Sequence, residues 1–308
     1  MKVYKVVPRG YCKGVVSAIK IAKQCAIDYP NQPISILGMI VHNQYIVDAL
    51  KDLGIKTIDQ KGKTRLELLD EIDEGVVIIT AHGAGEDVFD KAKRKGLIVV
   101  DATCKDVIKT HDLIKVALSS SKEVLYIGKK GHPEAEGALA IDTKKIHLIE
   151  KKEDLLNLED PNQNYIITNQ TTMSLWDVEK ISQFALKNLP HVKIMKETCN
   201  ATTIRQMALT KLPEDIDLVY VVGDLHSNNT TRLATIAQEN SNALVKRIDS
   251  IDQIEIEDLK NKHHVAITSG ASTPTYLTNL IIEYLEQFDP NDQNTYEKPN
   301  IDYQKILK

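Results

Sequence analysis

The chain repeats one pattern three times, and this repeat constrains its fold more than any other feature. Each copy joins a short β-branched strand to a turn with a cysteine and then to a helical pattern. The copies are KVYKVVPRGYCKGVVSAI, GLIVVDATCKDVIKTHDLI and VKIMKETCNATTIRQMAL, and their cysteines are Cys12, Cys104 and Cys199, spaced by 92 and 95 residues. Three copies in one order predict three similar structural units.

Two further elements recur in the same order. A second strand follows each cysteine and ends in a glycine 24 to 26 residues after it, at Gly38, Gly128 and Gly223. A third strand follows 40 to 45 residues later, with Thr80, Thr168 and Thr268 in phase. Short strands that alternate with helical stretches predict βαβ units with parallel pairing.

We therefore predict an α/β fold of three similar parallel-sheet units, at residues 1–95, 96–190 and 191–286. Residues 287–308 form a polar C-terminal tail, which we expect to pack across another unit. The strand before each cysteine could instead pair with the sheet of the preceding unit, which would move these limits. Because ligands of parallel units gather where strands lead into helices, units packed around a pseudo-threefold axis would line one central cavity with such loops.

Composition and charge exclude several classes of protein. With 42% hydrophobic and 27% charged residues, the chain has the composition of a soluble globular protein. Its net charge of −4 argues against a general nucleic-acid binder. No apolar run suits a membrane span or a signal peptide. Four widely spaced cysteines without a secretory signal predict reduced thiols in the cytoplasm.

The repeated cysteines have two interpretations. A cysteine where a helix begins lies at the positive end of the helix dipole, which stabilises the thiolate and favours metal ligation. The alternative is a small buried hydrophobe, the usual role of a single cysteine. Repetition in phase favours ligation for Cys12, Cys104 and Cys199, whereas Cys25 falls out of phase inside a helical pattern and is expected in the core.

Thiolates favour zinc, copper(I) or iron–sulfur clusters. The chain lacks the CxxC pairs of structural zinc sites and the compact CxxCxxC run of ferredoxins. A [4Fe–4S] cluster seen along its body diagonal has three equivalent irons and one unique iron. Three cysteines in equivalent positions would bind the three equivalent irons and leave the unique iron open to substrate.

The loops of the predicted cavity carry many hydrogen-bond donors, which suit a phosphate or diphosphate at helix N-termini. They include His42, His132 and Ser227, then Gln44, Glu134 and Asn229, and finally His82, Gln170–Thr172 and Ser272. The alternative for the Ser, Thr and Asn residues is helix capping. Glu134 is the one carboxylate among the phase-matched positions and is the candidate proton donor, with a helix-start glutamate as its alternative. The KGKTR stretch at 61–65 lacks the first glycine of a Walker A motif.

Together these residues resemble the 4-hydroxy-3-methylbut-2-enyl diphosphate reductase family, also called LytB. The matching stretches run from residue 9 to 274: RGYCKGV, IVHNQ, TAHGAG, DATC, GHPEAEG, NQTT, TCNATTIRQ, SNN and SGASTP. The resemblance implies a trefoil of three units and a [4Fe–4S] cluster with an open iron. It implies the last step of the methylerythritol phosphate route to isoprenoids, in which an allylic diphosphate loses its hydroxyl to give isopentenyl and dimethylallyl diphosphates. An external electron donor such as ferredoxin or flavodoxin is also implied.

The resemblance also implies roles for individual residues. Cys12, Cys104 and Cys199 would hold the cluster. Thr171 would lie near the substrate hydroxyl, and Glu134 would deliver protons. The diphosphate would contact His42, His82, His132, Ser227, Asn228, Asn229 and Ser272.

Some positions depart from the family pattern. Lys105 replaces a usual proline, Val16-Ser17 an Asp-Arg pair, Asn228 a second serine and Ser269 a common alanine. Two other functions remain open. A hydro-lyase of the aconitase kind also uses an open iron but needs no external electrons, and a cluster sensor would not need so many phosphate donors.

Overall fold

The computed structural model describes residues 1–308 and divides the chain into two compact units. The first unit contains Met1–Lys13, His42–Ala49 and Asn200–Lys308, and the second contains Gly14–Val41 and Leu50–Cys199. No helix of the chain is both long enough and apolar enough to cross a membrane.

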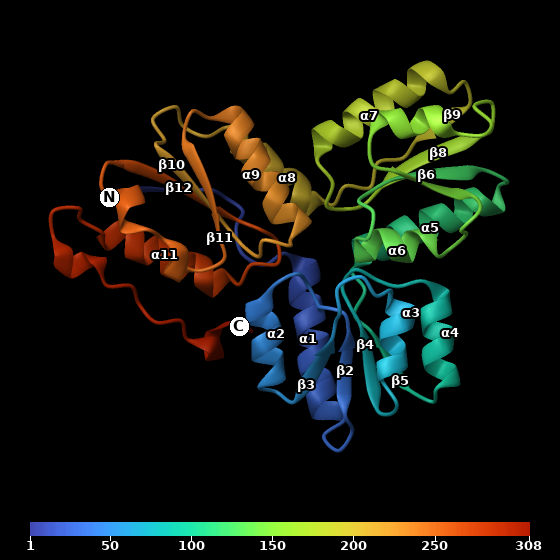
Figure 1. Ribbon diagram of the computed structural model, residues 1–308, viewed down its shortest axis with the longest axis horizontal. Coiled ribbons are helices and arrows are strands. Elements are labelled where there is room, and N and C mark those ends of the chain that lie inside the picture. Colours follow the sequence, from blue (N-terminus) through green and yellow to red (C-terminus); the bar gives the residue numbers. More distant parts are fainter. The chain divides into compact units, whose positions relative to one another are not determined.

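Three parallel four-stranded sheets form the core of the fold (Figure 1). In the second unit, one sheet has the order β3-β2-β4-β5 and the other β7-β6-β8-β9; in the first unit the order is β11-β10-β12-β1. All pairings are parallel. The predicted α/β fold of three similar parallel-sheet units is confirmed.

The strands are short and mostly buried, as the β-branched runs predicted. Their bounds are β1 Lys2–Lys5, β2 Ile34–Leu37, β3 Ile55–Ile58, β4 Val76–Ile79, β5 Ile98–Asp101, β6 Glu123–Ile127, β7 Ile146–Ile149, β8 Tyr165–Asn169, β9 Val192–Ile194, β10 Leu218–Val222, β11 Leu244–Ile248 and β12 His264–Ser269. The strand before each cysteine is an edge strand (β1, β5 or β9). β5 and β9 pair with the inner strands β4 and β8 of the preceding repeat, and β1 pairs with β12 of the third repeat. This is the alternative pairing considered above. The limits at residues 95, 190 and 286 remain predictions about the sequence repeat.

The helices alternate with the strands. Their bounds are α1 Lys13–Asp28, α2 Gln44–Lys51, α3 Arg65–Leu68, α4 Glu86–Arg94, α5 Lys105–Ser119, α6 Pro133–Leu139, α7 Leu175–Asn188, α8 Asn200–Leu209, α9 Asn228–Asn240, α10 Ile256–Leu259 and α11 Thr275–Gln287. Short 3₁₀ turns lie at Leu69–Glu71, Lys152–Asn157, Ile251–Gln253, Gln293–Tyr296 and Tyr303–Lys305.

The repeated glycines occupy one structural position. The N–H groups of Gly38, Gly128 and Gly223 donate to the last residues of the neighbouring edge strands, Ile58, Ile149 and Ile248, at 2.8, 3.1 and 2.8 Å. Each glycine therefore directly follows the last residue of its strand and begins the loop that leads to the next helix.

The repeated threonines do not all correspond. Thr168 and Thr268 lie in their strands and pair with Tyr126 and Val221 of the neighbouring strands. The last pair of the equivalent register in the β2–β4 sheet is Leu37 with Ile79, so Thr80 lies just beyond its strand. The prediction that the three threonines are in phase is wrong, because Thr80 is equivalent to Gln170 and Gly270, the residues that directly follow β8 and β12.

Each sheet buries side chains on both faces, as parallel sheets with helical crossovers do. In the first unit, Val219 and Val221 of β10 pack with α8 and α9, whereas Tyr220 and Val222 pack with α11. Figure 1 shows these helices on opposite sides of the sheet. In the second unit, the β6–β8 sheet packs one face against α7 and the other against α5 and α6.

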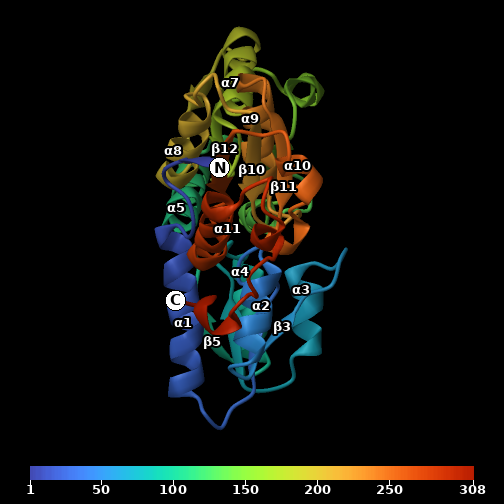
Figure 2. The same cartoon turned by 90° about the vertical axis from the view of Figure 1, so that its left-hand side faces the viewer.

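The C-terminal tail packs within the first compact unit. The hydroxyl of Tyr11 donates to the carbonyl of Ile306 at 2.7 Å, and the side chain of Ile306 is fully buried. The rings of Tyr45 and Tyr303 lie 5.9 Å apart. Figure 2 shows the tail leaving α11 and reaching the C-terminus through its last short turn. The prediction that the tail packs across another repeat is confirmed, since Tyr11 and Tyr45 belong to the first.

Candidate active site

Each repeated cysteine lies immediately before a helix, at the start of α1, α5 or α8. Its main-chain N–H donates to a carbonyl in the loop after an inner strand: Cys12 to Ala271 and Cys104 to Ala81 at 3.0 Å, and Cys199 to Thr171 at 3.1 Å. All three residues are partly exposed, whereas Cys25 is only 3% exposed and lies in the core, as predicted. Three thiols held in one backbone setting at helix N-termini fit a thiolate-ligated iron–sulfur group.

Glu134 lies in the first turn of α6 with its side chain buried. Its Oε1 accepts the main-chain N–H of Thr171 at 2.6 Å, and its Oε2 accepts the Thr171 hydroxyl at 3.1 Å. Burial raises the pKa of Glu134 from 4.5 to about 7, although both hydrogen bonds from Thr171 lower it. Near neutral pH this carboxyl therefore remains partly protonated and can give up a proton.

His132 is the N-cap residue of α6. Its Nδ1 accepts the main-chain N–H of Glu134 at 3.1 Å. A ring nitrogen that accepts a hydrogen bond carries no proton, so this ring is neutral and its hydrogen is on Nε2. The cap therefore places the ring hydrogen of His132 on Nε2.

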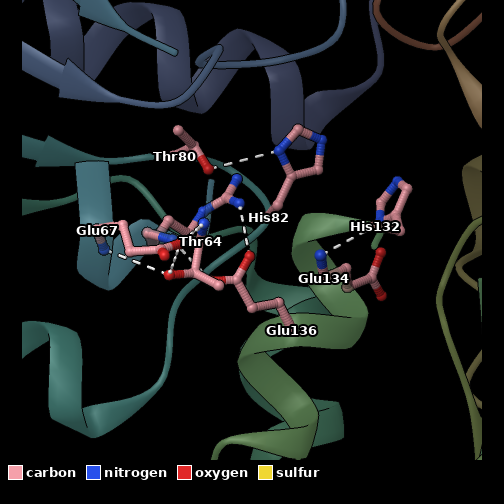
Figure 3. A network of polar contacts seen from close by, with 8 residues as sticks. Thr64, Glu67, Thr80, His82, His132, Glu134 and Glu136 are labelled. Atoms are coloured by element: carbon pink, nitrogen blue, oxygen red, sulfur yellow. Dashed lines mark hydrogen bonds and ion pairs between the residues drawn. The ribbon is translucent and has the colours of Figure 1, made fainter. Parts of the chain in front are cut away.

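His82 lies beside His132 in the same compact unit. The two rings pack edge to face with their centroids 5.5 Å apart. The Nδ1 of His82 lies 3.4 Å from the hydroxyl of Thr80, which follows β4 (Figure 3). The second unit thus brings His82, His132, Glu134 and Thr171 together at the ends of two neighbouring sheets.

The first compact unit gathers the other predicted substrate contacts on three loops. The hydroxyl of Ser272 donates to the carbonyl of His42 at 3.0 Å. Asp224 accepts the main-chain N–H of Gln44 at 3.3 Å, which joins the His42 loop to the loop before α9. The N-cap of α2 is Asn43 rather than His42, because the Asn43 amide oxygen accepts the N–H of Ile46.

The start of α9 combines capping with a buried amide. Ser227 is the N-cap residue, and its hydroxyl accepts the main-chain N–H of Thr230 at 3.3 Å. Asn228 and Asn229 follow, both buried. Neither the nitrogen nor the oxygen of the Asn229 side-chain amide has a hydrogen-bond partner. A buried amide without hydrogen-bond partners is costly, which makes Asn229 a candidate contact for a ligand.

Sequence reasoning missed two features of the site. Ser269 accepts the main-chain N–H of Gly10 at 2.6 Å, two residues before Cys12, which a smaller alanine could not do. Arg65 pairs with Glu136 of α6. The only sequence signal for the second feature was the capping box of Thr64 and Glu67, which marks a helix start in the stretch set aside as a failed Walker motif.

The chain matches the family model described as "LytB protein" over residues 3–286. It is 49% identical to a protein of Geobacillus sp. (strain WCH70) and 50% identical to one of Bacillus cytotoxicus, covering 100% of this chain and 98% of each relative. Both are named 4-hydroxy-3-methylbut-2-enyl diphosphate reductase. The solved structure of the corresponding Plasmodium falciparum reductase is similar with a TM-score of 0.86 and 31% identity, over 94% of this chain and 89% of that chain.

Proposed function

Because the chain belongs to the LytB protein family, we propose that it is a 4-hydroxy-3-methylbut-2-enyl diphosphate reductase, an oxidoreductase of isoprenoid biosynthesis. A second reductase structure, similar at a TM-score of 0.66 and 28% identity, is described as the terminal enzyme of the non-mevalonate pathway. The observation that carries the proposal is the buried carboxyl of Glu134, which accepts two hydrogen bonds from Thr171 and whose pKa burial raises to about 7. A binding protein would have no need for such a group.

The reaction removes the hydroxyl of (E)-4-hydroxy-3-methylbut-2-enyl diphosphate. The allylic C–O bond breaks, a C–H bond forms, and the oxygen leaves as water. Two electrons and two protons balance the change. The products are isopentenyl and dimethylallyl diphosphates, which differ in the carbon that receives the proton.

We assign one [4Fe–4S] cluster to Cys12, Cys104 and Cys199. Their positions directly before three helices support this assignment, since the dipole of each helix favours a thiolate. When bound, such a cluster supplies the electrons and an open iron that polarises the C–O bond. An external donor such as ferredoxin or flavodoxin would reduce it, and we expect the enzyme to work in the cytoplasm.

The protein's own part in the chemistry is to hold and move the proton. With Glu134 protonated, Oε2 can donate to the Thr171 hydroxyl, which then turns its own hydrogen toward the leaving oxygen. The second contact, from the main-chain N–H of Thr171 to Oε1, is the same in both protonation states of the carboxyl. Thr171 would therefore pass a proton without either residue moving.

The remaining residues bind the diphosphate. His132 offers Nε2–H because its Nδ1 is engaged in the α6 cap. Asn229 offers a buried amide, and Asn228, Ser227, Ser272, His42 and His82 complete the proposed donor set. Asn228 can donate through its amide where the family usually has serine. Neutral donors at helix N-termini bind an anion without importing fixed positive charge.

Anaerobic purification, iron and sulfide analysis and visible spectroscopy test the cofactor, and turnover with a chemically reduced dye tests the reaction. Consumption of the allylic diphosphate that depends on reduced dye separates the reductase from a hydro-lyase, which needs no electrons. His42→Ala, His82→Ala and Ser272→Ala should each weaken substrate binding about tenfold or more while the visible spectrum persists, since charge-assisted hydrogen bonds contribute roughly 1.5–3 kcal/mol. A cluster-loaded protein that neither binds nor reduces the diphosphate would exclude the proposal and favour a sensor.

A further inference from the structure

An ion pair in the second compact unit connects α6, the helix of Glu134, to the short helix α3. Arg65 begins α3, and its main-chain N–H donates to Oε1 of Glu136 at 2.8 Å. Its guanidinium Nη1 donates to Oε2 of the same carboxylate at 3.3 Å. Glu136 lies in α6, two residues after Glu134 (Figure 3). Two donors from α3 therefore fix one carboxylate of α6.

This pair differs from the surface ion pairs of the chain. The side chains of Arg65 and Glu136 are 8% and 29% exposed, whereas those of the nearby pair Lys63 and Glu71 are 38% and 44% exposed. Burial lowers the pKa of Arg65, and Glu136 raises it again. A buried guanidinium without its counter-ion is strongly unfavourable, so the two side chains hold each other in place.

Close backbone packing leaves α6 little freedom beside this pair. A Cβ at Gly137 would lie 3.3 Å from the Cα of Ala84, and a Cβ at Gly85 would lie 2.5 Å from the Cβ of Ala140. The helix thus packs directly on the loop that follows β4 and carries His82. A Cβ at Gly38 would lie 3.2 Å from Nη2 of Arg65, so the guanidinium also packs against the glycine turn after β2.

We propose that Arg65 is a positioning residue, which acts through Glu136 to fix the first turn of α6 and hence the carboxyl of Glu134 and the ring of His132. Arg65 contacts neither of those groups in the hydrogen bonds described, and Glu134 takes its hydrogen bonds from Thr171. Arg65 therefore acts on the positions of Glu134 and His132 and not through a direct contact with them. The consequence for turnover rests on the proposed function, because it concerns delivery of the proton.

The test separates an effect of Arg65 on the position of α6 from its effect on the stability of the protein. Arg65→Met or Glu136→Met leaves one buried group without its partner and should lower the melting temperature. Arg65→Met combined with Glu136→Met removes both charges and should recover much of that loss, as apolar replacement of buried pairs often does. The double variant should still turn over about 10- to 100-fold more slowly than the parent, with KM changed less, because a displacement near 1 Å is enough for such losses.

Hydrogen–deuterium exchange provides a readout that needs no activity. In the cluster-loaded protein without substrate, amides of residues 134–139 should exchange about tenfold faster in the double variant, even where its melting temperature matches the parent. The exposed pair supplies the control, since Lys63→Met with Glu71→Met should change neither kcat nor exchange of α6.

Parent-like kcat and parent-like exchange of α6 in the double variant would overturn the proposal. If the double variant does not fold, Arg65→Lys provides the test instead. Lysine keeps the positive charge but lacks the several N–H donors of the planar guanidinium. It should lower kcat severalfold and speed exchange in α6, and an unchanged kcat with unchanged exchange would equally overturn the proposal. A parent that lacks reductase activity would instead contradict the proposed function, and the exchange experiment would still report on Arg65.

Discussion

Thr171 donates to both carboxyl oxygens of Glu134, from its main-chain N–H at 2.6 Å and from its hydroxyl at 3.1 Å. Glu134 lies in the first turn of α6, which follows β6, and Thr171 lies in the loop after β8 of the same sheet. Hydrogen bonds of this kind stabilise a carboxylate, yet burial outweighs them and leaves the pKa of Glu134 at about 7. The site thus holds its proton by excluding water.

The first prediction concerns this proton. Glu134→Gln keeps the shape and the hydrogen bond from the Thr171 N–H but cannot donate a titratable proton. Turnover with reduced dye should fall about 10²–10⁴-fold, the usual contribution of general acid catalysis. In the parent, turnover should decline as pH rises above about 7, where Glu134 ionises.

Iron content and substrate affinity serve as the controls for this variant. Both should match the parent, because Glu134 binds neither the cluster nor the diphosphate in the proposed mechanism. Turnover within a few-fold of the parent at equal iron content would assign the proton to another group.

A second prediction links the same group to stability. The pKa of Glu134 is higher in the folded chain (about 7) than its ordinary value of 4.5. Between these pH values the folded chain keeps the proton while the unfolded chain releases it, so the contribution of the group is greatest below pH 4.5 and is lost as pH rises to about 7. The change amounts to about 3 kcal/mol at 1.36 kcal/mol per unit.

Denaturant unfolding of the parent and of Glu134→Gln, compared from pH 5 to pH 8, measures this change. The stability of the parent relative to the variant should fall with rising pH and level off above about 7. A difference that stays constant over this range would show that Glu134 is not held as an acid.

A third prediction separates the two roles of His132. Asparagine is a good N-cap residue, so His132→Asn should keep an acceptor for the Glu134 N–H and preserve the stability of α6. The same substitution removes the Nε2–H donor and should weaken diphosphate binding about tenfold. His132→Ala should lose both, with a stability cost of about 1 kcal/mol. Calorimetric titration with the diphosphate and thermal unfolding measure the two effects. Equal affinity in the parent and His132→Asn would show that Nε2 does not contact the ligand.

The repeat could be predicted well because local residue patterns mark each of its copies. Gly38, Gly128 and Gly223 end equivalent strands, and β-branched runs mark each strand. Thr80 was misjudged, because alignment by residue type matched it to Thr168 and Thr268, which lie two residues earlier relative to the ends of their strands.

The candidate site was predictable only in part. Residues that bear reactive groups in repeated loops, such as Glu134, could be named from their phase alone. The residues proposed to position these groups could not be named, since the Arg65–Glu136 pair joins residues 71 positions apart that share no motif. Ser269 was noted as unusual, but its bond to Gly10 depends on a pairing of β1 with β12 at the two ends of the chain.

The fourth prediction concerns the cysteines. Cys12→Ala, Cys104→Ala or Cys199→Ala should each abolish turnover and lower the iron bound per chain after anaerobic purification. Cys25→Ala is the matched control, because Cys25 is buried in α1 and burial raises the pKa of its thiol, which disfavours ligation. It should keep the parent's iron content, with at most a packing cost. Normal iron and activity in Cys104→Ala would remove the assignment of the cluster ligands.

The last prediction follows from the buried amide of Asn229. Neither amide atom has a hydrogen-bond partner, and the residue is only 5% exposed. An unsatisfied buried polar group costs about 1–3 kcal/mol, a cost that binding of a diphosphate would offset. Asn229→Leu is close in size and removes the amide, so it should raise the unfolding free energy without ligand by about 1 kcal/mol or more. The same variant should bind the diphosphate at least about tenfold more weakly, because the anion then loses a donor. Urea unfolding with and without ligand measures both effects on one protein. A variant that is less stable than the parent and binds the diphosphate equally well would mean that Asn229 serves packing at the start of α9 rather than the ligand.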